Sequence, residues 1–269
     1  MQTKESTPDS NPIVIKISGT LLADGGAPEA FWTALHTLQK TSPVVMVHGG
    51  GAQATAMAHR LDHEPTIVQG RRVTSDLDLD IMQWALRGKL NTQLVGDAKR
   101  HGITAVGLSG ADGNTLQVTK RPPWTVNGDT VDFGWVGDVE GVDASLLHSI
   151  LAAGMVPIVA PLGIDAAGQT YNVNADTVAR ALAGALGAEE LLLVTATGGV
   201  RREADVPESH LATCTADTFE EGTEAGWING GMRVKMEVAF DALRGGVDDV
   251  FILAPDDLVR RSHATRVVG

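Results

Sequence analysis

The segment VMVHGGGAQ, residues 45–53, joins a short apolar run to three consecutive glycines. Residues 45–47 resemble a buried strand, and a helix-like stretch follows the glycines. Three glycines cost backbone entropy on folding, so their small size must be needed here. Glycine N–H groups can converge on an anion without steric hindrance, and a following helix N-terminus adds positive potential. The segment therefore predicts either an anion-binding loop or a tight strand-to-helix turn without a ligand.

The same alternation of apolar runs and helix-like stretches extends along the chain. Short β-branched runs occupy residues 12–17, 43–47, 104–108, 155–160, 191–195 and 249–253, and most precede a glycine turn. Helical spacing of apolar residues marks 28–40, 75–100, 143–153, 175–186 and 231–243. Continuous apolar strands between helices predict an α/β, three-layer αβα sandwich with a mostly parallel central sheet. Ligands of such sheets bind beyond the carboxyl ends of the strands, where these glycine turns fall.

One segment breaks this alternation. Residues 114–137 are rich in turn residues, and the runs LQVTK and TVDFGWV alternate enough to predict a protruding β-hairpin. No polar linker divides the chain, so we expect a single domain over residues 1–269 with two lobes, about 12–175 and about 176–269. Residues 1–11 are polar and predict a disordered tail.

Composition narrows the class of partner and compartment. The net charge of −12, from 33 acidic and 21 basic residues, argues against nucleic acid as the main partner. It indicates either an ordinary solvated surface or adaptation to high salt. No apolar run approaches a membrane span, and the N-terminus lacks a secretory h-region. Cys214 is the only cysteine, which fits a cytoplasmic location.

Basic residues stand at two places that suit anion binding. Lys16 lies inside an apolar strand, where an ammonium group needs water or an anion as partner. Arg71 and Arg72 precede a helix, and guanidinium groups bind carboxylates and phosphates bidentately. Surface exposure would explain all three without a ligand.

Polar residues and glycines open two later helices. Asn172, Asn174 and Asp176 lie at the start of one, where Asn174 can cap the helix; capping leaves the other two unexplained. Lys235 lies in the first turns of another, after the glycine pair at 230–231. A glycine turn at 195–200 also follows an apolar strand.

Together these motifs are specific. KISG, VHGGG, GRRVT, AVGLSGADG, PIVAPLG, YNVNAD and GWINGGMRVK occur in this order between residues 12 and 268. The order resembles the amino acid kinase family and, within it, the acetylglutamate kinases. The segment from Lys120 to Leu147 most resembles a bacterial branch in which the acyl group is succinyl.

The resemblance implies a role for each motif. Gly50 and Gly51 would hold the acylated amino acid, Arg72 would bind its α-carboxylate, and Asn172 would contact the same substrate. Catalytic roles are implied for three residues: Lys16 and Lys235 would stabilise the transferring phosphoryl group, and Asp176 would hold the two lysines. The nucleotide would contact Ser18, Gly19, Thr195, Gly198, Gly199 and Asn229. The lobe at 12–175 would bind the acyl amino acid, and the lobe at 176–269 the nucleotide.

The implied reaction moves the γ-phosphoryl group of ATP to the γ-carboxylate of an N-acyl-L-glutamate, the second step of arginine biosynthesis. A glutamate-type carboxyl has a pKa near ~4.3, so the nucleophile is already ionised and needs no general base. Positive charge must instead bring two anions together. Mg²⁺ would arrive with ATP, without a metal site of the protein's own. An N-succinyl substrate would need a further cation, for which Arg71 and Lys120 are candidates.

Two positions depart from the family pattern. Ser18 replaces a glycine of Lys-x-Gly-Gly, and its small hydroxyl can still face phosphate. The turn VTATGGV lacks the aspartate of Ser-Asp-Val-x-Gly-Val, and neither Thr195 nor Ala196 can replace a carboxylate. Nucleotide affinity or base preference should therefore differ from that of the family.

Other expectations concern assembly and alternative functions. Arginine-inhibited hexameric relatives carry an extra N-terminal helix that the first twelve residues here cannot build, so we expect a homodimer that arginine does not inhibit. One alternative is a kinase for glutamate or aminoadipate on an acidic carrier protein, docked by Arg60, Arg71, Arg72, Arg87 and Lys89. Another is a non-catalytic amino-acid sensor, which would have no need of Lys16, Asp176 and Lys235 together.

Overall fold

The computed structural model describes residues 10–22, 26–126, 128–203 and 205–269. The predicted disordered tail therefore lies outside the described residues, except for its last two. Within the described ranges, no helix is both long and apolar enough to cross a membrane.

An eight-stranded sheet forms the centre of the molecule. Its strand order is β14-β16-β15-β13-β1-β2-β10-β5, and every neighbouring pair is parallel except β15 with β16. The strands are β1 (Ile13–Ile17), β2 (Val44–His48), β5 (Ala105–Ser109), β10 (Val156–Ala160), β13 (Glu190–Val194), β14 (Thr213–Cys214), β15 (Asp249–Leu253) and β16 (Thr265–Val267). The predicted strands are thus confirmed to within a residue or two, and so is the mostly parallel sheet.

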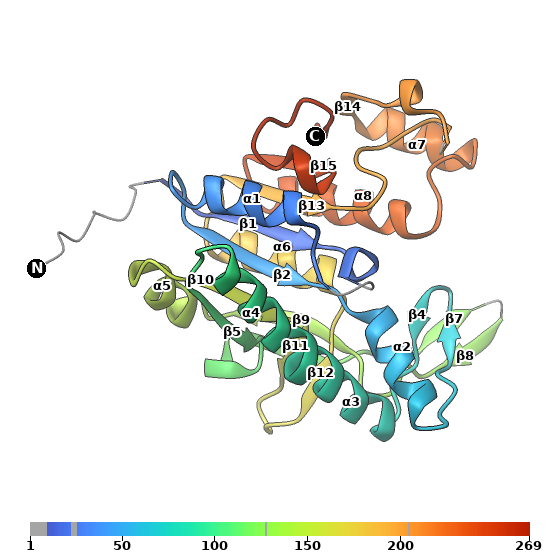
Figure 1. Cartoon of the computed structure of the whole chain (residues 1–269). Coiled ribbons are helices and arrows are strands. Elements are labelled where there is room, and N and C mark those ends of the chain that lie inside the picture. Colours follow the sequence, from blue (N-terminus) through green and yellow to red (C-terminus); the bar gives the residue numbers. More distant parts are fainter. Residues whose placement is uncertain (1–9, 23–25, 127, 204) are drawn as a thin grey trace, which may run out of the picture.

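Helices cover both faces of this sheet, as expected for buried apolar strands (Figure 1). One face packs against α5 (Ser145–Ala152), α6 (Ala175–Ala185) and α8 (Gly230–Arg244), with α7 (Ala216–Glu224) beside them. The other face packs against α1 (Glu29–Leu38) and α4 (Asn91–Arg100). The three-layer αβα sandwich is therefore confirmed.

The helix predicted over 75–100 is continuous but not uniform. It runs through α3 (Asp76–Met82), a π-helical segment at Gln83–Leu90, and α4. Ser75 caps its start through a capping box with Asp78, so the predicted serine cap is confirmed. Below we refer to residues 76–100 as the long helix; it packs beside α2 (Gly51–Arg60).

Smaller sheets lie beside the main one. A four-stranded sheet has the order β12-β11-β6-β9, made of β12 (Thr170–Asn172), β11 (Leu162–Ile164), β6 (Leu116–Lys120) and β9 (Gly137–Val142). Two hairpins are β3 (Ile67–Val68) with β4 (Arg71–Arg72), and β7 (Trp124–Val126) with β8 (Asp129–Val131). Short 3₁₀ turns cover Gly19–Leu22, Asp112–Asn114, Pro207–Ser209 and Pro255–Asp257.

The hairpin expected near 114–137 needs one correction. The run LQVTK, now β6, pairs with β9 at 137–142 rather than with the TVDFGWV run. The hairpin itself is shorter, formed by β7 and β8 and placed at the edge of the molecule beside β4 (Figure 1). Gly128 and Asp129 predicted the tight turn, but no pattern in the sequence indicated which strand LQVTK would pair with.

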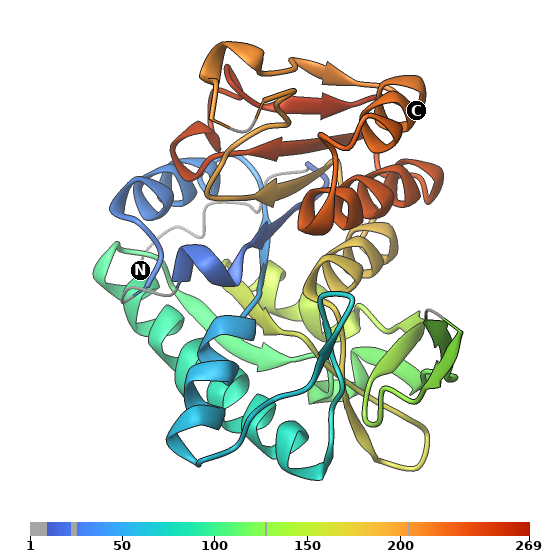
Figure 2. The same cartoon turned by 90° about the vertical axis from the view of Figure 1, so that its right-hand side faces the viewer.

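The elements separate along the sheet. Figure 2 shows the orange and red C-terminal elements at one end of the molecule and the cyan and green hairpins at the other. β1 and β2 lie at the middle of the sheet, and the glycine turns follow their carboxyl ends. This is the position at which parallel sheets bind ligands.

Candidate active site

Two lysines and one aspartate meet at the carboxyl end of β1. The Nζ atom of Lys16 lies 2.8 Å from Oδ1 of Asp176, and the Nζ atom of Lys235 lies 3.7 Å from Oδ2. The side chains of Lys16 and Asp176 are only 5% and 8% exposed, so water screens their charges little. Burial lowers the pKa of Lys16; Asp176 opposes this shift and the neighbouring charge of Lys235 adds to it.

Strand alternation explains why Lys16 reaches Asp176. Ile15 and Ile17 point to the core beneath α1 and α4, so Lys16, between them, points to the face covered by α6 and α8. Asp176 lies in the first turn of α6, whose N-terminus is capped by Asn174: its Oδ1 accepts from the backbone N–H groups of residues 176 and 177. The predicted cap is thus confirmed, and it leaves the Asp176 carboxylate to the lysines.

These residues line a cavity of about 450 Å³. Its described walls carry five basic side chains, Lys16, Arg71, Arg72, Arg121 and Lys235, against one acidic side chain, Asp176. The N-termini of α2 and α6 also open onto it, which adds positive potential. A chain of net charge −12 thus concentrates positive charge at one place, as a site for anions requires.

Two glycine turns touch at the cavity edge. A Cβ atom on Gly19 would lie 2.7 Å from the backbone nitrogen of Gly50, and one on Gly49 would lie 2.7 Å from that of Gly19. A side chain on Gly50 would meet Leu86 of the long helix at 2.7 Å. Gly51 differs, because a Cβ there would meet no described atom within 4 Å and the residue lines the cavity. Three glycines are thus needed for packing, and Gly51 leaves free space.

A buried histidine holds the triglycine loop from below. His48 Nδ1 lies 2.8 Å from the carbonyl oxygen of Gly49, which can only accept, so Nδ1 carries the proton. Nε2 therefore accepts from the Asn91 amide at 3.1 Å, and the same amide donates to the carbonyl of Ile158 at 2.8 Å. Complete burial lowers the pKa of His48 to about 4. His48 is therefore a neutral support for the loop rather than an acid or base.

Arg72 is fixed before any substrate arrives. It lies on the β3–β4 hairpin and donates to Asp78 Oδ1 at 3.2 Å and to Thr55 Oγ1 at 2.7 Å. Asp78 in turn belongs to the capping box of the long helix. Asn172 lies across the cavity and donates to Thr74 Oγ1 at 3.2 Å. The predicted substrate residues thus come together around one space.

Two further arginines share the ring of Trp124. The guanidinium carbon of Arg71 lies 4.9 Å from the ring centroid and that of Arg121 lies 4.7 Å from it. Arg121 also donates to Asp138, at 2.9 and 2.6 Å. Arg71 has no ion pair within the described ranges. Burial lowers the pKa of Arg71, and the charge of Arg121 lowers it further, so Arg71 favours a nearby anion.

The residues predicted to contact nucleotide divide into two groups. Ser18 and Gly19 line the cavity, whereas Thr195, Gly198, Gly199 and Asn229 are not among its lining residues. The turn after β13 nevertheless adjoins the first group, because the Ser18 N–H donates to the carbonyl of Val194 at 3.1 Å. The Thr195 hydroxyl donates to the carbonyl of Gly198 at 2.7 Å, which closes that turn.

The described residues offer no group of three or more His, Cys, Asp or Glu side chains that could hold a metal. Asp176 is the single carboxylate among the described lining residues, and both its oxygens face lysines.

Sequence reasoning missed several supporting residues. Asn91 contacts His48 across 43 residues of sequence and Thr55 contacts Arg72 across 17, whereas Asp78 stands six residues from Arg72. Of these three residues, only Asp78 belongs to a pattern that can be recognised in the sequence, because it stands three residues after the capping serine. The five basic residues considered for carrier docking do not form one set of unpaired cations, because Arg72 pairs with Asp78 and Arg87 pairs with Asp112.

Fold and cavity together define an α/β protein with a cationic cavity at the carboxyl ends of its parallel strands. A sequence model described as the amino acid kinase family matches residues 11–254. The chain therefore belongs to the amino acid kinase family.

Individual relatives and solved structures are also similar to this chain. An acetylglutamate kinase of Anaeromyxobacter sp. (strain K) is 44% identical over 255 residues, covering 91% of this chain and 93% of the relative. The smu.665 protein of Streptococcus mutans UA159 superposes with a TM-score of 0.76 at 27% identity, covering 90% of this chain and 94% of that one. An N-acetylglutamate synthase of Neisseria gonorrhoeae gives a TM-score of 0.80 at 25% identity, covering 96% of this chain but 59% of the synthase.

Proposed function

We propose that this protein transfers the γ-phosphoryl group of ATP to the γ-carboxylate of N-acetyl-L-glutamate, in the second step of arginine biosynthesis. The observation that carries the proposal is the pair of lysines on either side of Asp176, at the base of a cationic cavity. Curated relatives named acetylglutamate kinase support it, because the matched regions cover 93% and 83% of their length.

The geometry suits a carboxylate nucleophile. Such a group is ionised at neutral pH, so the site needs no base and contains no histidine in its described lining. Lys16 and Lys235 stabilise the charge on the transferring phosphoryl group, and Asp176 keeps both ammonium groups in place. Arg72 binds the α-carboxylate, while the N–H groups at Gly50 and Gly51 face the reacting carboxylate.

The proposal includes Mg²⁺ bound to the phosphates of ATP, where it would neutralise phosphate charge. It also assigns the acyl amino acid to the lobe at 12–175 and the nucleotide to the lobe at 176–269. The turn after β13, beside Ser18, supports this division because it lies next to the lysine-bearing strand. Thr195, Gly198, Gly199 and Asn229 then contact the nucleotide.

A second acceptor, N-succinyl-L-glutamate, is favoured by one observation. Arg71 lines the cavity without an ion pair in the described structure, so it could receive an additional carboxylate. Lys120, the other candidate, is bound to Asp132 at 3.0 Å and is not among the lining residues. Arg71→Leu should lower kcat/KM for the succinyl substrate roughly tenfold and leave the acetyl substrate unchanged. Lys120→Leu is the matched control.

We also propose a homodimer. The sheet ends at β5, and Trp84 on the adjoining long helix is 50% exposed. An open edge and a large exposed aromatic side chain together suit a second copy. Light scattering that gives the mass of two chains supports this; a monomer or a hexamer contradicts it.

A coupled ADP-release assay with Mg-ATP tests the main proposal. N-acetyl-L-glutamate should be phosphorylated, and L-glutamate without an acyl group should not. Lys16→Met and Lys235→Met should each lower kcat by a factor on the order of 10² to 10³, as the loss of one preorganised donor does. No turnover with either acylated substrate would move the assignment to a carrier-linked acceptor.

A further inference from the structure

A second cavity, of about 340 Å³, lies between α2 and the long helix. Helix α2 contributes to the walls of both cavities. Gly51 and Thr55 line the active-site cavity, whereas Gln53 and Met57 line the second one, and Ala52 lines both. The two spaces are therefore separated by a single helix, and we call the second one the α2 cavity.

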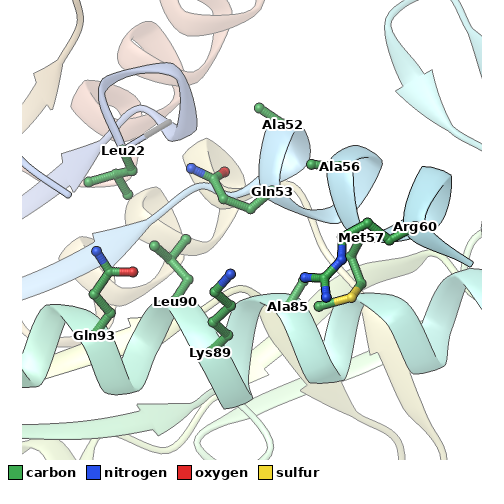
Figure 3. A pocket seen from close by; sticks show the side chains of 10 residues that line it. All are labelled: Leu22, Ala52, Gln53, Ala56, Met57, Arg60, Ala85, Lys89, Leu90 and Gln93. Atoms are coloured by element: carbon green, nitrogen blue, oxygen red, sulfur yellow. The ribbon is translucent and has the colours of Figure 1, made fainter. Parts of the chain in front are cut away.

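The α2 cavity combines apolar walls with two cations. Its apolar lining consists of Leu22, Ala52, Ala56, Met57, Ala85 and Leu90. Arg60 comes from α2 and Lys89 from the long helix, and Figure 3 shows the head groups of both directed into the space between the helices. Within the described ranges, neither side chain has an ion pair or hydrogen bond.

Arg60 and Lys89 converge on the α2 cavity, and neither has a carboxylate partner among the described residues. The chain carries 33 acidic against 21 basic residues, and neighbouring arginines of the long helix do find carboxylates: Arg87 pairs with Asp112, and Arg100 with Asp97. Separate exposed cations would need no explanation, but these two converge on one apolar cavity. Charge complementarity therefore selects an anion, and the lining selects an apolar body attached to it.

We propose that the α2 cavity binds a small monocarboxylate with an apolar body of about ten non-hydrogen atoms, a size suited to a pocket near the lower limit for small ligands. Its carboxylate lies between Arg60 and Lys89, and its body contacts Leu22, Met57 and Leu90. This inference does not depend on the reaction proposed for the active-site cavity.

The α2 cavity is also connected to the active-site loops. Gln53, in its wall, donates from Nε2 to the carbonyl oxygen of Gly19 at 3.1 Å. Gly19 is in turn packed against Gly50 with no room for a side chain. An occupant therefore touches the helix and the side chain that hold both glycine turns. Resting on the proposed function, we infer that occupancy of the α2 cavity changes the affinity for N-acetyl-L-glutamate. By thermodynamic reciprocity, N-acetyl-L-glutamate then changes the affinity of the α2 cavity for its ligand by the same factor.

Isothermal titration of the full chain with 4-phenylbutyrate tests the site. We expect saturable binding of one molecule per chain with a Kd in the millimolar range or below. Lys89→Met and Arg60→Met should each weaken it by roughly three- to fivefold, as loss of an exposed charge contact does. The matched control Lys99→Met, an exposed lysine of the same helix outside the cavity, should leave Kd within twofold. The uncharged analogue 4-phenyl-1-butanol should bind at least tenfold more weakly.

Several results would overturn the site. These are no saturable binding, equal binding of the alcohol, or a Kd unchanged in both cavity variants. Direct competition by N-acetyl-L-glutamate would place the probe in the active-site cavity. Binding lost as protein concentration rises would mean that a second copy covers the α2 cavity.

The coupling has its own test. We expect saturating N-acetyl-L-glutamate to change the Kd of 4-phenylbutyrate at least twofold without displacing it, and an unchanged Kd would overturn the coupling. Because binding is measured without turnover, an inactive protein that binds the probe contradicts only the proposed function. An active kinase that does not bind 4-phenylbutyrate contradicts only this inference.

Discussion

The ammonium group of Lys16 lies 2.8 Å from one carboxylate oxygen of Asp176, while Lys235 lies 3.7 Å from the other oxygen. One buried carboxylate thus holds two like charges close together at the base of the cavity. Without it, two ammonium groups would repel each other where water cannot screen them. Asp176 is therefore a positioning residue, and its effect should be measurable through both lysines.

The first prediction concerns Asp176→Asn. We expect kcat to fall by a factor on the order of 10², because both donors to the phosphoryl group lose their fixed position. The KM for ATP should change only a few-fold, since Asp176 faces lysines rather than the nucleotide. Steady-state kinetics with the control Asp132→Asn, which removes a lysine-paired carboxylate outside the cavity, measures this. A large loss of ATP affinity with turnover preserved would contradict the assignment.

The second prediction concerns pH. Turnover requires protonated Lys16, and burial already lowers its pKa, so the rate should fall at a lower pH than ordinary lysine titration would give. The charge of Asp176 opposes that shift, and Asp176→Asn removes this opposition. The descending limb of the kcat profile should therefore move to lower pH in the variant, with its residual activity highest on the acid side. A limb at the same pH in both proteins would exclude Lys16 as the titrating group.

The sequence predicts the strands and the proximity of Lys16, Asp176 and Lys235, but for different reasons. Periodicity and glycine turns identify the strands directly, whereas Lys16, Asp176 and Lys235 were joined by family resemblance, because spacing alone cannot bring distant residues together. The residues that support the site stayed hidden for the same reason. Asn91 lies within a long helix whose π segment no sequence pattern reveals, yet its amide contacts one residue on each of three strands, namely His48, Leu108 and Ile158.

The third prediction concerns His48 and stability. Its pKa is about 4 in the folded protein and 6.5 for the ordinary side chain, so the unfolded chain binds the extra proton first as pH falls. The stabilisation from neutral His48 is complete above pH 6.5 and is lost as pH falls to about 4. The whole effect amounts to about 3 kcal/mol of unfolding free energy.

Chemical denaturation between pH 4 and 7 measures this effect. The variant His48→Gln should flatten the pH dependence of stability by the equivalent of about one proton, whatever its absolute stability. His148→Gln, at an exposed position on α5, should keep the slope of the original protein. Equal slopes in all three proteins would show that His48 is not held neutral by the fold.

The fourth prediction separates two adjacent glycines. A methyl group on Gly50 would lie 2.7 Å from Leu86, whereas one on Gly51 would meet no described atom within 4 Å and would project where the cavity lies. Gly50→Ala should therefore destabilise the fold by about 1 to 3 kcal/mol through overpacking. Gly51→Ala should keep the melting temperature, because alanine is a good helix former, but should lower kcat/KM for N-acetyl-L-glutamate at least tenfold. Thermal melting and steady-state kinetics on the same two variants test both halves. If Gly51→Ala were fully active, the space beside Gly51 would not be the acceptor site, and the triglycine loop would serve only as a turn.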